Sequence, residues 1–428
     1  MGFVKDISLN IKGFMVNKTM KNDILKIMLL VLFAINVNIA LASTQSKESD
    51  KMIYFDHNAT TMAHEDVKKL AISLMGKPLN PSSIHTNGRE ARAIVEKARR
   101  QVAKSTGIGE NSKDYQITFT SCGTESDNWI ISNYSDGDVF ISSIEHAAIL
   151  EETQYLPSIK KIKVNIDGLV DLDDLRLLLS QSKNPKKLVS VMMANNETGV
   201  IQPIKEIVKI AKEFGAQVHS DCVQSFGKIE LNIVDLGIDF VTISAHKIGG
   251  LQGAAALIAK SEFALKPMIV GGGQEKKMRS GTENVLAIAG FGLASELAQQ
   301  ELEMRANKMR KLQKRLEDGI LKDFPQVKII GSASPRLPNT SLIIAPSNSD
   351  TDTQGKIMKF DLKGFAVSSG SACSAGKIGK SLVLMAMGVD YQDASSAIRV
   401  SLSHYNSEAE IDAFIKTFKE IYSSSLKK

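Results

Sequence analysis

Apolar runs that end in polar residues recur along this chain, with helical patterns between them. The run Lys187–Ala194 ends in two asparagines, and the run Phe240–Ile243 is followed by Ser, Ala, His and Lys. Between these runs, Pro203 opens a segment with apolar residues at helical spacing, and Gly215 closes it. Buried strands that alternate with helices form a parallel sheet. We therefore expect an α/β fold whose site lies outside the carboxyl ends of its strands.

Lys247 stands at the mouth of the second run, beside His246 and before Gly249 and Gly250. A lysine in this position is more often a solvated strand end. Burial among hydroxyl and imidazole groups favours a neutral amine instead, and a neutral amine is a nucleophile toward carbonyl groups. Schiff-base chemistry with pyridoxal phosphate is the use that such a lysine suggests.

The preceding strand, which begins at Gln217, ends in Asp221 and Gln224. A pyridoxal phosphate site needs a carboxylate against the pyridine nitrogen and a donor near the phenolic oxygen, and these two residues suit those roles. The alternative for Asp221 is a simple helix cap. Two successive strands with such endings favour the cofactor interpretation.

Further blocks along the chain resemble those of one family and occur in that family's order. They are Tyr54–Thr61, Asn80–His85, Gly123–Asn128, Glu145–His146, Asn195–Gly199, Gly271–Glu275, Arg279–Asn284 and Ser368–Cys373. Together with His219–Gln224 and Ser244–Lys247, they resemble the class V aminotransferase family and, within it, cysteine desulfurases of the NifS/IscS type. The resemblance runs from about Met52 to the C-terminal helix.

The resemblance implies a fold-type I pyridoxal-phosphate-dependent transferase. This fold has a mostly parallel central sheet with helices on both faces and a smaller C-terminal α+β domain. We expect a non-family extension at residues 1–51, a large cofactor-binding domain at 52–310 and a small domain at 311–428 that carries a mobile cysteine loop. Residues 52–65 are expected to pack with the small domain.

Periodicity predicts further elements around these blocks. Strands are expected at Gln116–Thr120, Asp138–Ser142, Ala254–Ile258, Val327–Ile330 and Thr340–Ile344. Helices are expected at Arg89–Thr106, over one long amphipathic stretch from Val285 to Phe324, and around Ile411–Ile421. Pro346–Gly355 is expected to be a polar loop.

The strand before Ser121 runs into Gly123 and Thr124, which open a helix. Backbone N–H groups at a helix N-terminus bind anions, although this pair is also compatible with an ordinary cap. The resemblance favours phosphate binding and implies a set of cofactor-binding residues. That set is Gly123, Thr124, His146, Asn196, Asp221, Gln224, Ser244, His246, Lys247 and Thr282. Thr282 would serve the other subunit of a homodimer, and Cys122 is expected to be a small core residue.

Cys373 lies in Ser368–Gly376, a loop of small residues, where an incidental surface cysteine is the alternative. The resemblance makes Cys373 the sulfur acceptor and joins it with Lys247 and His146 as the catalytic residues. Substrate cysteine would displace Lys247 from the cofactor, and Lys247 and His146 would then move protons. The Cys373 thiolate would attack the substrate sulfur, which leaves alanine and a persulfide on Cys373.

Substrate binding is assigned by the resemblance to Asn58, Asn196 and Arg399, whose forked guanidinium suits a carboxylate. The implied partners are L-cysteine, a second copy of the chain and an iron–sulfur scaffold or other sulfur-acceptor protein. No intrinsic metal is expected, although Cys373 could transiently ligate an iron–sulfur cluster. Relatives often continue Ser-Leu-Glu-Pro-Ser after the cysteine loop, whereas this chain has Lys377–Ser381, which leaves the acceptor and the rate of sulfur release open.

Composition narrows the setting of this reaction. The 428 residues are 43% hydrophobic and 23% charged, which is ordinary for a globular protein with a large core. The net charge of +6 comes from dispersed lysines, and no basic-aromatic module for nucleic acid is present. The 3 cysteines show no metal spacing and form no disulfide framework, so a reducing compartment and a cytoplasmic enzyme are expected.

The N-terminal extension conflicts with a purely cytoplasmic location. An apolar run, Ile27–Ile35, follows Lys18, Lys21 and Lys26 and precedes Ala40–Ser43, as in a secretory signal. Three interpretations compete: an export or anchor segment, an over-extended gene start and an organellar presequence. A membrane-anchored or exported form therefore stays open, and a membrane is a partner only if the segment is retained.

Two rival functions remain beside cysteine desulfuration for iron–sulfur or thio-cofactor assembly. One is a selenocysteine lyase or another class V aminotransferase, although a cysteine in this loop argues against a plain transaminase. The other is a non-catalytic sulfur-relay scaffold, which would have no need for Lys247, Asp221, His146 and Arg399 together. A bound chromophore in the purified protein would separate the enzymes from the scaffold.

Overall fold

The computed structural model describes residues 52–110, 112–345, 353–369 and 381–426. It separates the chain into two units, Met1–Met52 and Ile53–Lys428, and the architecture below is that of the second unit. The signal-like segment and Cys373 lie outside the described residues. None of the described helices is both long and apolar enough to cross a bilayer.

The largest sheet has seven strands in the order β2-β8-β7-β6-β5-β3-β4. Its strands are β2 (Tyr115–Thr120), β3 (Asp138–Ser142), β4 (Ile159–Ile162), β5 (Lys187–Ser190), β6 (Gln217–Asp221), β7 (Phe240–Ser244) and β8 (Ala255–Lys260). The strands from β7 to β4 pair in parallel, whereas β8 is antiparallel to both of its neighbours. The mostly parallel central sheet predicted from the sequence is confirmed.

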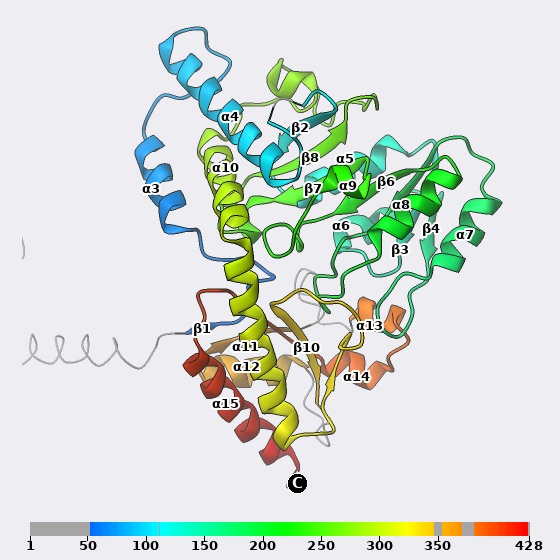
Figure 1. Ribbon diagram of the computed structural model, residues 1–428, viewed down its shortest axis with the longest axis vertical. Coiled ribbons are helices and arrows are strands. Elements are labelled where there is room, and N and C mark those ends of the chain that lie inside the picture. Colours follow the sequence, from blue (N-terminus) through cyan, green and yellow to red (C-terminus); the bar gives the residue numbers. More distant parts are fainter. Residues whose placement is uncertain (1–51, 111, 346–352, 370–380, 427–428) are drawn as a thin grey trace, which may run out of the picture. The chain divides into compact units, whose positions relative to one another are not determined.

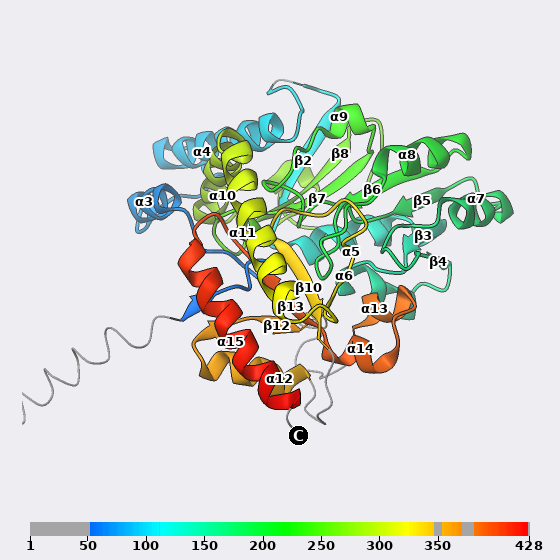
Figure 2. The ribbon, with the colours of Figure 1, turned by 60° about the horizontal axis from the view of Figure 1, so that its bottom comes forward.

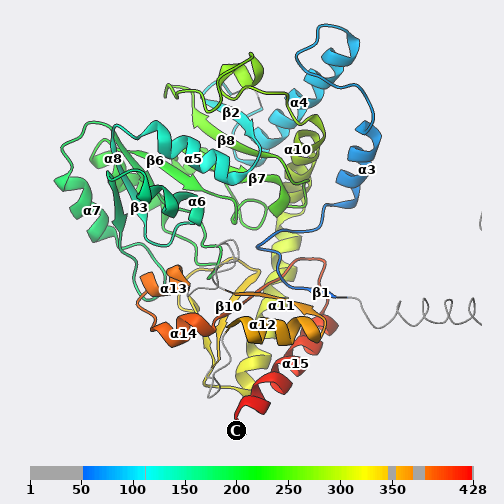
Figure 3. The ribbon, with the colours of Figure 1, turned by 180° about the vertical axis from the view of Figure 1, so that it is seen from behind.

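Helices cover both faces of this sheet because its strands direct apolar side chains alternately to each face. Phe140 of β3 belongs to one buried cluster, whereas its neighbours Val139 and Ile141 belong to another. Figures 1 and 3 show the helices from opposite sides. The first cluster includes residues of α4 (Thr86–Ser105), α7 (Leu172–Gln181), α8 (Ile204–Glu213) and α10 (Val285–Gln300), and the second includes residues of α5 (Gly123–Asn133) and α6 (Ala147–Leu150).

The helix predicted from Val285 to Phe324 is divided into α10 and α11 (Leu302–Asp323). The backbone at Glu301 departs from helical geometry, with φ −103° and ψ 8°. Residues on nearly all sides of α10 are buried, and it packs on α4 and α3 (Glu65–Leu74), whereas α11 buries one face. The break therefore coincides with a change of packing, and the two helices lie end to end (Figure 1).

A smaller antiparallel sheet follows, in the order β12-β13-β10-β9. Its strands are β9 (Lys328–Ile329), β10 (Thr340–Ile344), β12 (Ser368–Ser369) and β13 (Ile398–Ser401). Helices α11, α12 (Thr353–Leu362) and α15 (Glu408–Leu426) lie beside this sheet in Figure 2. Short helices complete the second unit: α9 (Ile233–Leu236), α13 (Leu382–Ala386) and α14 (Tyr391–Ser396).

Aromatic side chains form the core of this smaller part. Phe414 of α15 stacks on Phe360 of α12 with 5.0 Å between ring centroids, and Phe55 meets Phe414 at 5.5 Å. Next to Phe55, β1 (Ile53–Tyr54) pairs in parallel with β11 (Phe365–Ala366). A domain boundary near residue 310 stays a prediction. Of the predicted loop 346–355, the first seven residues lie outside the described part, and the rest begin α12.

Candidate active site

Five strands deliver polar residues to one edge of the large sheet. Because β2 and β7 are both antiparallel to β8, β2 points the same way as the parallel strands. The residues that follow β2, β3, β5, β6 and β7 meet around a cavity of about 230 Å³. Its lining residues are Cys122, Gly123, Thr124, Asp127, His146, Met192, Asn196, Asp221, Val223, Gln224, Ser244, His246 and Lys247. The structure thus brings together every predicted cofactor-binding residue except Thr282.

The N-terminus of α5 faces this cavity through Gly123 and Thr124. The N-cap residue Cys122 makes no side-chain hydrogen bond to the helix, so the first N–H groups have no side-chain cap. The expectation that Cys122 is a core residue is wrong, because its side chain is exposed and lines the cavity. A short loop between β2 and α5 leaves the cysteine outside the packed layers.

Asp221 ends β6 and is buried beside the cavity. One carboxylate oxygen accepts a hydrogen bond from the Val223 N–H at 2.8 Å. Burial raises the pKa of Asp221, and the nearby His146 and Lys247 oppose that rise. A cationic partner in the cavity would therefore relieve a carboxylate that the protein alone satisfies poorly.

Lys247 lies in the short 3-10 turn after β7. Its ammonium group donates to the carbonyl oxygens of Asn58 and Ala59 at 2.5 and 2.6 Å. His246 contacts the Thr60 hydroxyl at 3.1 Å, and burial lowers its pKa to about 4. His246 is therefore neutral near pH 7, next to Lys247.

His146 caps α6 at the end of β3. Its Nδ1 accepts a hydrogen bond from the Ala148 N–H at 3.1 Å, so the neutral ring carries its proton on Nε2. Burial lowers the pKa of His146, although the Asp221 carboxylate opposes the shift. The imidazole is thus a neutral group at the cavity wall whose Nε2 can donate a proton, and whose Nδ1 can accept one only if it gives up its bond to the Ala148 N–H.

Arg399 of β13 is 1% exposed and lies between the two sheets. Its guanidinium donates to the Asn196 carbonyl oxygen at 3.0 Å and forms an ion pair with Asp56 at 2.7 Å. The Nε atom of Arg399 is buried without a hydrogen-bond partner among the described residues. One donor of the fork is therefore left for a further acceptor.

Asn58 has an internal position rather than a place on the cavity lining. It is 1% exposed, and its amide nitrogen donates to Thr340 Oγ1 at 2.8 Å and to the Asn196 carbonyl oxygen at 3.2 Å. Its side-chain oxygen accepts from Lys228 and Asn339. These bonds connect the two sheets beneath the cavity, and a contact of Asn58 with substrate stays a prediction.

Thr282 lines a different pocket, of about 250 Å³, together with Ser121, Glu275 and Arg279. Arg279 forms an ion pair at 2.8 Å with Glu125, which follows Thr124 in α5. The pocket around Thr282 therefore adjoins the same helix N-terminus. A role of Thr282 in a partner subunit stays a prediction, as does the role of Cys373, which lies outside the described residues.

Sequence reasoning missed two buried ionisable side chains near the cavity, Asp127 and Lys228. Asp127 lines the cavity, and its burial, with Asp221 nearby, raises its pKa. The available signal was spacing, since Asp127 lies one helical turn after Gly123. Lys228 likewise lies four residues after Gln224 and donates to its side-chain oxygen at 2.9 Å.

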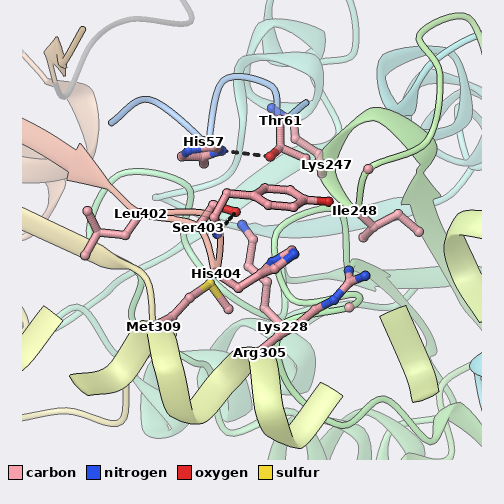
Figure 4. Close-up of a pocket in the computed structure, with 13 residues that line it drawn as sticks. His57, Thr61, Lys228, Lys247, Ile248, Arg305, Met309, Leu402, Ser403 and His404 are labelled. Atoms are coloured by element: carbon pink, nitrogen blue, oxygen red, sulfur yellow. Dashed lines mark hydrogen bonds between the residues drawn. The ribbon is translucent and has the colours of Figure 1, made fainter. Parts of the chain in front are cut away.

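A third, smaller pocket is also lined by Lys247 (Figure 4). Its volume is about 30 Å³, enough for a water molecule. The wall includes His57, Lys228, Arg305 and His404, and Figure 4 shows His57 in contact with Thr61. Burial lowers the pKa of His57 to about 4, so this imidazole is neutral near pH 7.

The donor set of the larger cavity fits pyridoxal phosphate. The Ser244 hydroxyl is buried without a hydrogen-bond partner among the described residues and, with the N-terminus of α5, suits a phosphate. Asp221 is the carboxylate that a pyridine nitrogen needs, and Lys247 is the amine that forms the covalent link.

Comparison with known proteins agrees with this geometry. Residues 53–414 match the class-V aminotransferase family. A cysteine desulfurase of Nostoc sp. is 38% identical over 380 residues, which cover 86% of this chain and 92% of that protein. A NifS-like protein from Rickettsia africae is 54% identical, with a TM-score of 0.83 over 87% of this chain and 99% of that one.

A third relative is the structure of SspA in complex with cysteine, which is 26% identical. Its TM-score is 0.69 over 83% of this chain and 99% of that chain. The family match covers most of the chain, and the predicted fold and family are both confirmed. The chain belongs to the class-V aminotransferase family and, within it, to the cysteine desulfurases of the NifS/IscS type.

Proposed function

We propose that this protein is a pyridoxal-phosphate-dependent cysteine desulfurase, which converts L-cysteine to L-alanine and leaves the sulfur as a persulfide on Cys373. The observation that carries the proposal is the convergence of Lys247, Asp221, His146 and the α5 N-terminus on one cavity. The similarity to cysteine desulfurases, and to one relative solved with cysteine, supports L-cysteine as the substrate.

Bound pyridoxal phosphate supplies the electron sink that makes substrate protons labile. The protein would hold it by Asp221 at the ring nitrogen, Gln224 at the phenolic oxygen, and Ser244 with the α5 N-terminus at the phosphate. Lys247 is the covalent attachment point. As a free amine, Lys247 would be able to take and return a proton at the cavity.

Arg399 is the group that we assign to the substrate carboxylate. Its buried Nε has no partner among the described residues, so the guanidinium can donate to a carboxylate oxygen while it keeps its bond to the Asn196 carbonyl. Asp56 already accepts a hydrogen bond from another nitrogen of the guanidinium, Nη2, at 2.7 Å. The substrate carboxylate would therefore compete with, or sit beside, a protein carboxylate.

The wider setting is part of the same proposal. The active form is a homodimer in which Thr282 reaches the phosphate bound by the other subunit. The persulfide passes to an iron–sulfur scaffold or another sulfur-acceptor protein, and Cys373 can transiently ligate the cluster being assembled. The enzyme works in the cytoplasm; a membrane-bound form requires the N-terminal segment.

The visible spectrum of the purified protein with added pyridoxal phosphate tests the function. We expect a yellow protein whose absorption band changes on addition of L-cysteine, with alanine formed in step with sulfide when a thiol is present. Selenocysteine is assayed in parallel, and a strong preference for it would favour a lyase. A protein that stays colourless with excess cofactor would overturn the proposal and favour the scaffold alternative.

Replacing Arg399 by Gln should raise KM for L-cysteine by about 10–100-fold, because a charge-assisted hydrogen bond to the substrate carboxylate is lost. The kcat should fall less than kcat/KM does. A matched control is Arg336→Gln, which breaks an ion pair with Glu317 at 2.9 Å away from the cavity. Equal KM values for Arg399→Gln and wild type would contradict the assignment.

A further inference from the structure

Lys228 is a buried lysine that the reaction outlined above does not use. It is 6% exposed, and no described carboxylate forms an ion pair with it. Burial lowers the pKa of Lys228 well below its usual range, and the neighbouring charges of Lys247 and Arg399 lower it further. A buried lysine destabilises the fold unless its hydrogen bonds compensate for the hydration that its amine loses.

Both hydrogen bonds of Lys228 end on side-chain amide oxygens. Its Nζ donates to Gln224 Oε1 at 2.9 Å and to Asn58 Oδ1 at 3.1 Å. A neutral amine still has two N–H groups, so both bonds persist if Lys228 loses its proton. Both donor bonds can therefore form in either charge state, and the protonated amine, which has no lone pair, can only donate.

These bonds fix which way the Gln224 amide points. An amine hydrogen can face only the amide oxygen, and the Asn58 carbonyl, 3.0 Å from Nε2, can face only the amide nitrogen. Both partners thus select one orientation of the two that an amide can adopt. One hydrogen of Nε2 remains, and Gln224 lines the cofactor cavity.

We propose that Lys228 is a positioning residue for the reaction, which locks the Gln224 amide so that its N–H, and not its carbonyl, faces the phenolic oxygen of the cofactor. The inference rests on the proposed function, because it presumes pyridoxal phosphate in the cavity. Without Lys228 the Asn58 carbonyl alone would hold the amide, so the turned-over orientation, which presents an acceptor to the anionic oxygen and repels it, would cost less free energy than in the wild type.

The small pocket shown in Figure 4 leaves room for a variant of Lys228 that restores the N–H donor. Lys228 and Lys247 both line this pocket, and Figure 4 shows both side chains there, with Arg305 and His57. Its volume of about 30 Å³ leaves room for a somewhat larger side chain at position 228. Lys228→Arg keeps N–H donors beside Gln224, whereas Lys228→Met keeps the length of the side chain and removes every donor.

The readout is a pH titration of the cofactor's visible band in the loaded protein without substrate. An N–H donor stabilises the anionic form of the phenolic oxygen. The proton that this oxygen shares with the Lys247 nitrogen is then lost at lower pH, so the midpoint of the titration is lower. Loss of the donor should raise the midpoint by about 1 pH unit in Lys228→Met. His57 and His246 have pKa values of about 4, so both are neutral near pH 7 and neither changes its charge there.

A double substitution decides whether Lys228 acts through Gln224. The double variant Gln224→Leu/Lys228→Met should have the same midpoint as Gln224→Leu alone. The single variant Lys228→Arg, in contrast to Lys228→Met, should have a midpoint close to that of the wild type. Lys356→Met, which removes another buried lysine on α12, is the control and should not shift the midpoint. Thermal unfolding of the cofactor-free proteins shows which variants fold.

The outcomes separate this inference from the function on which it rests. If wild type binds no chromophore, the proposed function fails. If wild type is yellow and the midpoint of Lys228→Met stays at the wild-type value, or shifts equally with and without Gln224, the positioning role is overturned. A shift that requires Gln224 and is reversed by arginine establishes it.

Discussion

Lys247→Ala should produce a protein that makes no measurable alanine from L-cysteine. We expect turnover to fall by a factor of about 10⁴ or more, because the residue is both the attachment point and a proton-transferring group. Its amine is held at the cavity by the carbonyl oxygens of Asn58 and Ala59, a geometry that no other described lysine shares. Alanine is measured by amino-acid analysis, and the visible spectrum of the variant should resemble free pyridoxal phosphate.

The control for this substitution is Lys260→Ala. Lys260 also ends a strand of the large sheet, but it pairs with Asp239 at 2.6 Å and does not line the cavity. That variant should keep its colour and its activity. Alanine production by Lys247→Ala at even a tenth of the wild-type rate, in a variant with a wild-type circular dichroism spectrum, would contradict the assignment.

The fold could be predicted because the strands carry their signal locally. Runs such as Phe240–Ile243 are rich in apolar and β-branched residues, and the structure shows why: Phe240 and Val241 enter clusters on opposite faces of the sheet. The predicted strand Thr340–Ile344 has the observed bounds. The edge that holds the site followed from the same reasoning, since Asp221 ends one strand and Lys247 lies in the short turn after the next.

The parts that could not be predicted depend on contacts between distant segments. The break at Glu301 reflects the different surroundings of α10 and α11, which the helical periodicity of the sequence does not record. The partners of Asn58 come from segments more than a hundred residues away, such as Lys228 and Thr340. Lys228 looks like a surface lysine in the sequence, and only its burial singles it out.

The position of Cys373 can be bounded by the residues on either side of its segment. Ser368 of β12 pairs directly with Arg399 of β13, and Ser381, at the other end, donates to a carboxylate oxygen of Glu197. Three residues lie between Ser369 and Cys373, and the four Cα–Cα steps from one to the other span at most about 14 Å in an extended chain. Ser368 thus lies beside Arg399, to which we assign the substrate carboxylate, and Ser381 lies beside Glu197, whose neighbour Asn196 lines the cavity.

Cys373→Ala should abolish sulfide release, by a factor of about 10³ or more, while the protein keeps its yellow colour and its spectral response to L-cysteine. The reason is that the cofactor and the proton-transferring groups are intact, whereas the sulfur has no thiolate to receive it. Mass spectrometry of the wild type after one turnover should place one extra sulfur on the peptide that contains Cys373.

Cys222→Ala is the matched control for the persulfide. Burial raises the pKa of the Cys222 thiol to about 12, so it stays protonated and cannot act as a nucleophile near pH 7. This variant should still carry sulfur on Cys373 and release sulfide. Sulfide release by Cys373→Ala at the wild-type rate, or a persulfide found on Cys122 instead, would move the acceptor role away from Cys373 and toward the thiol that already lines the cavity.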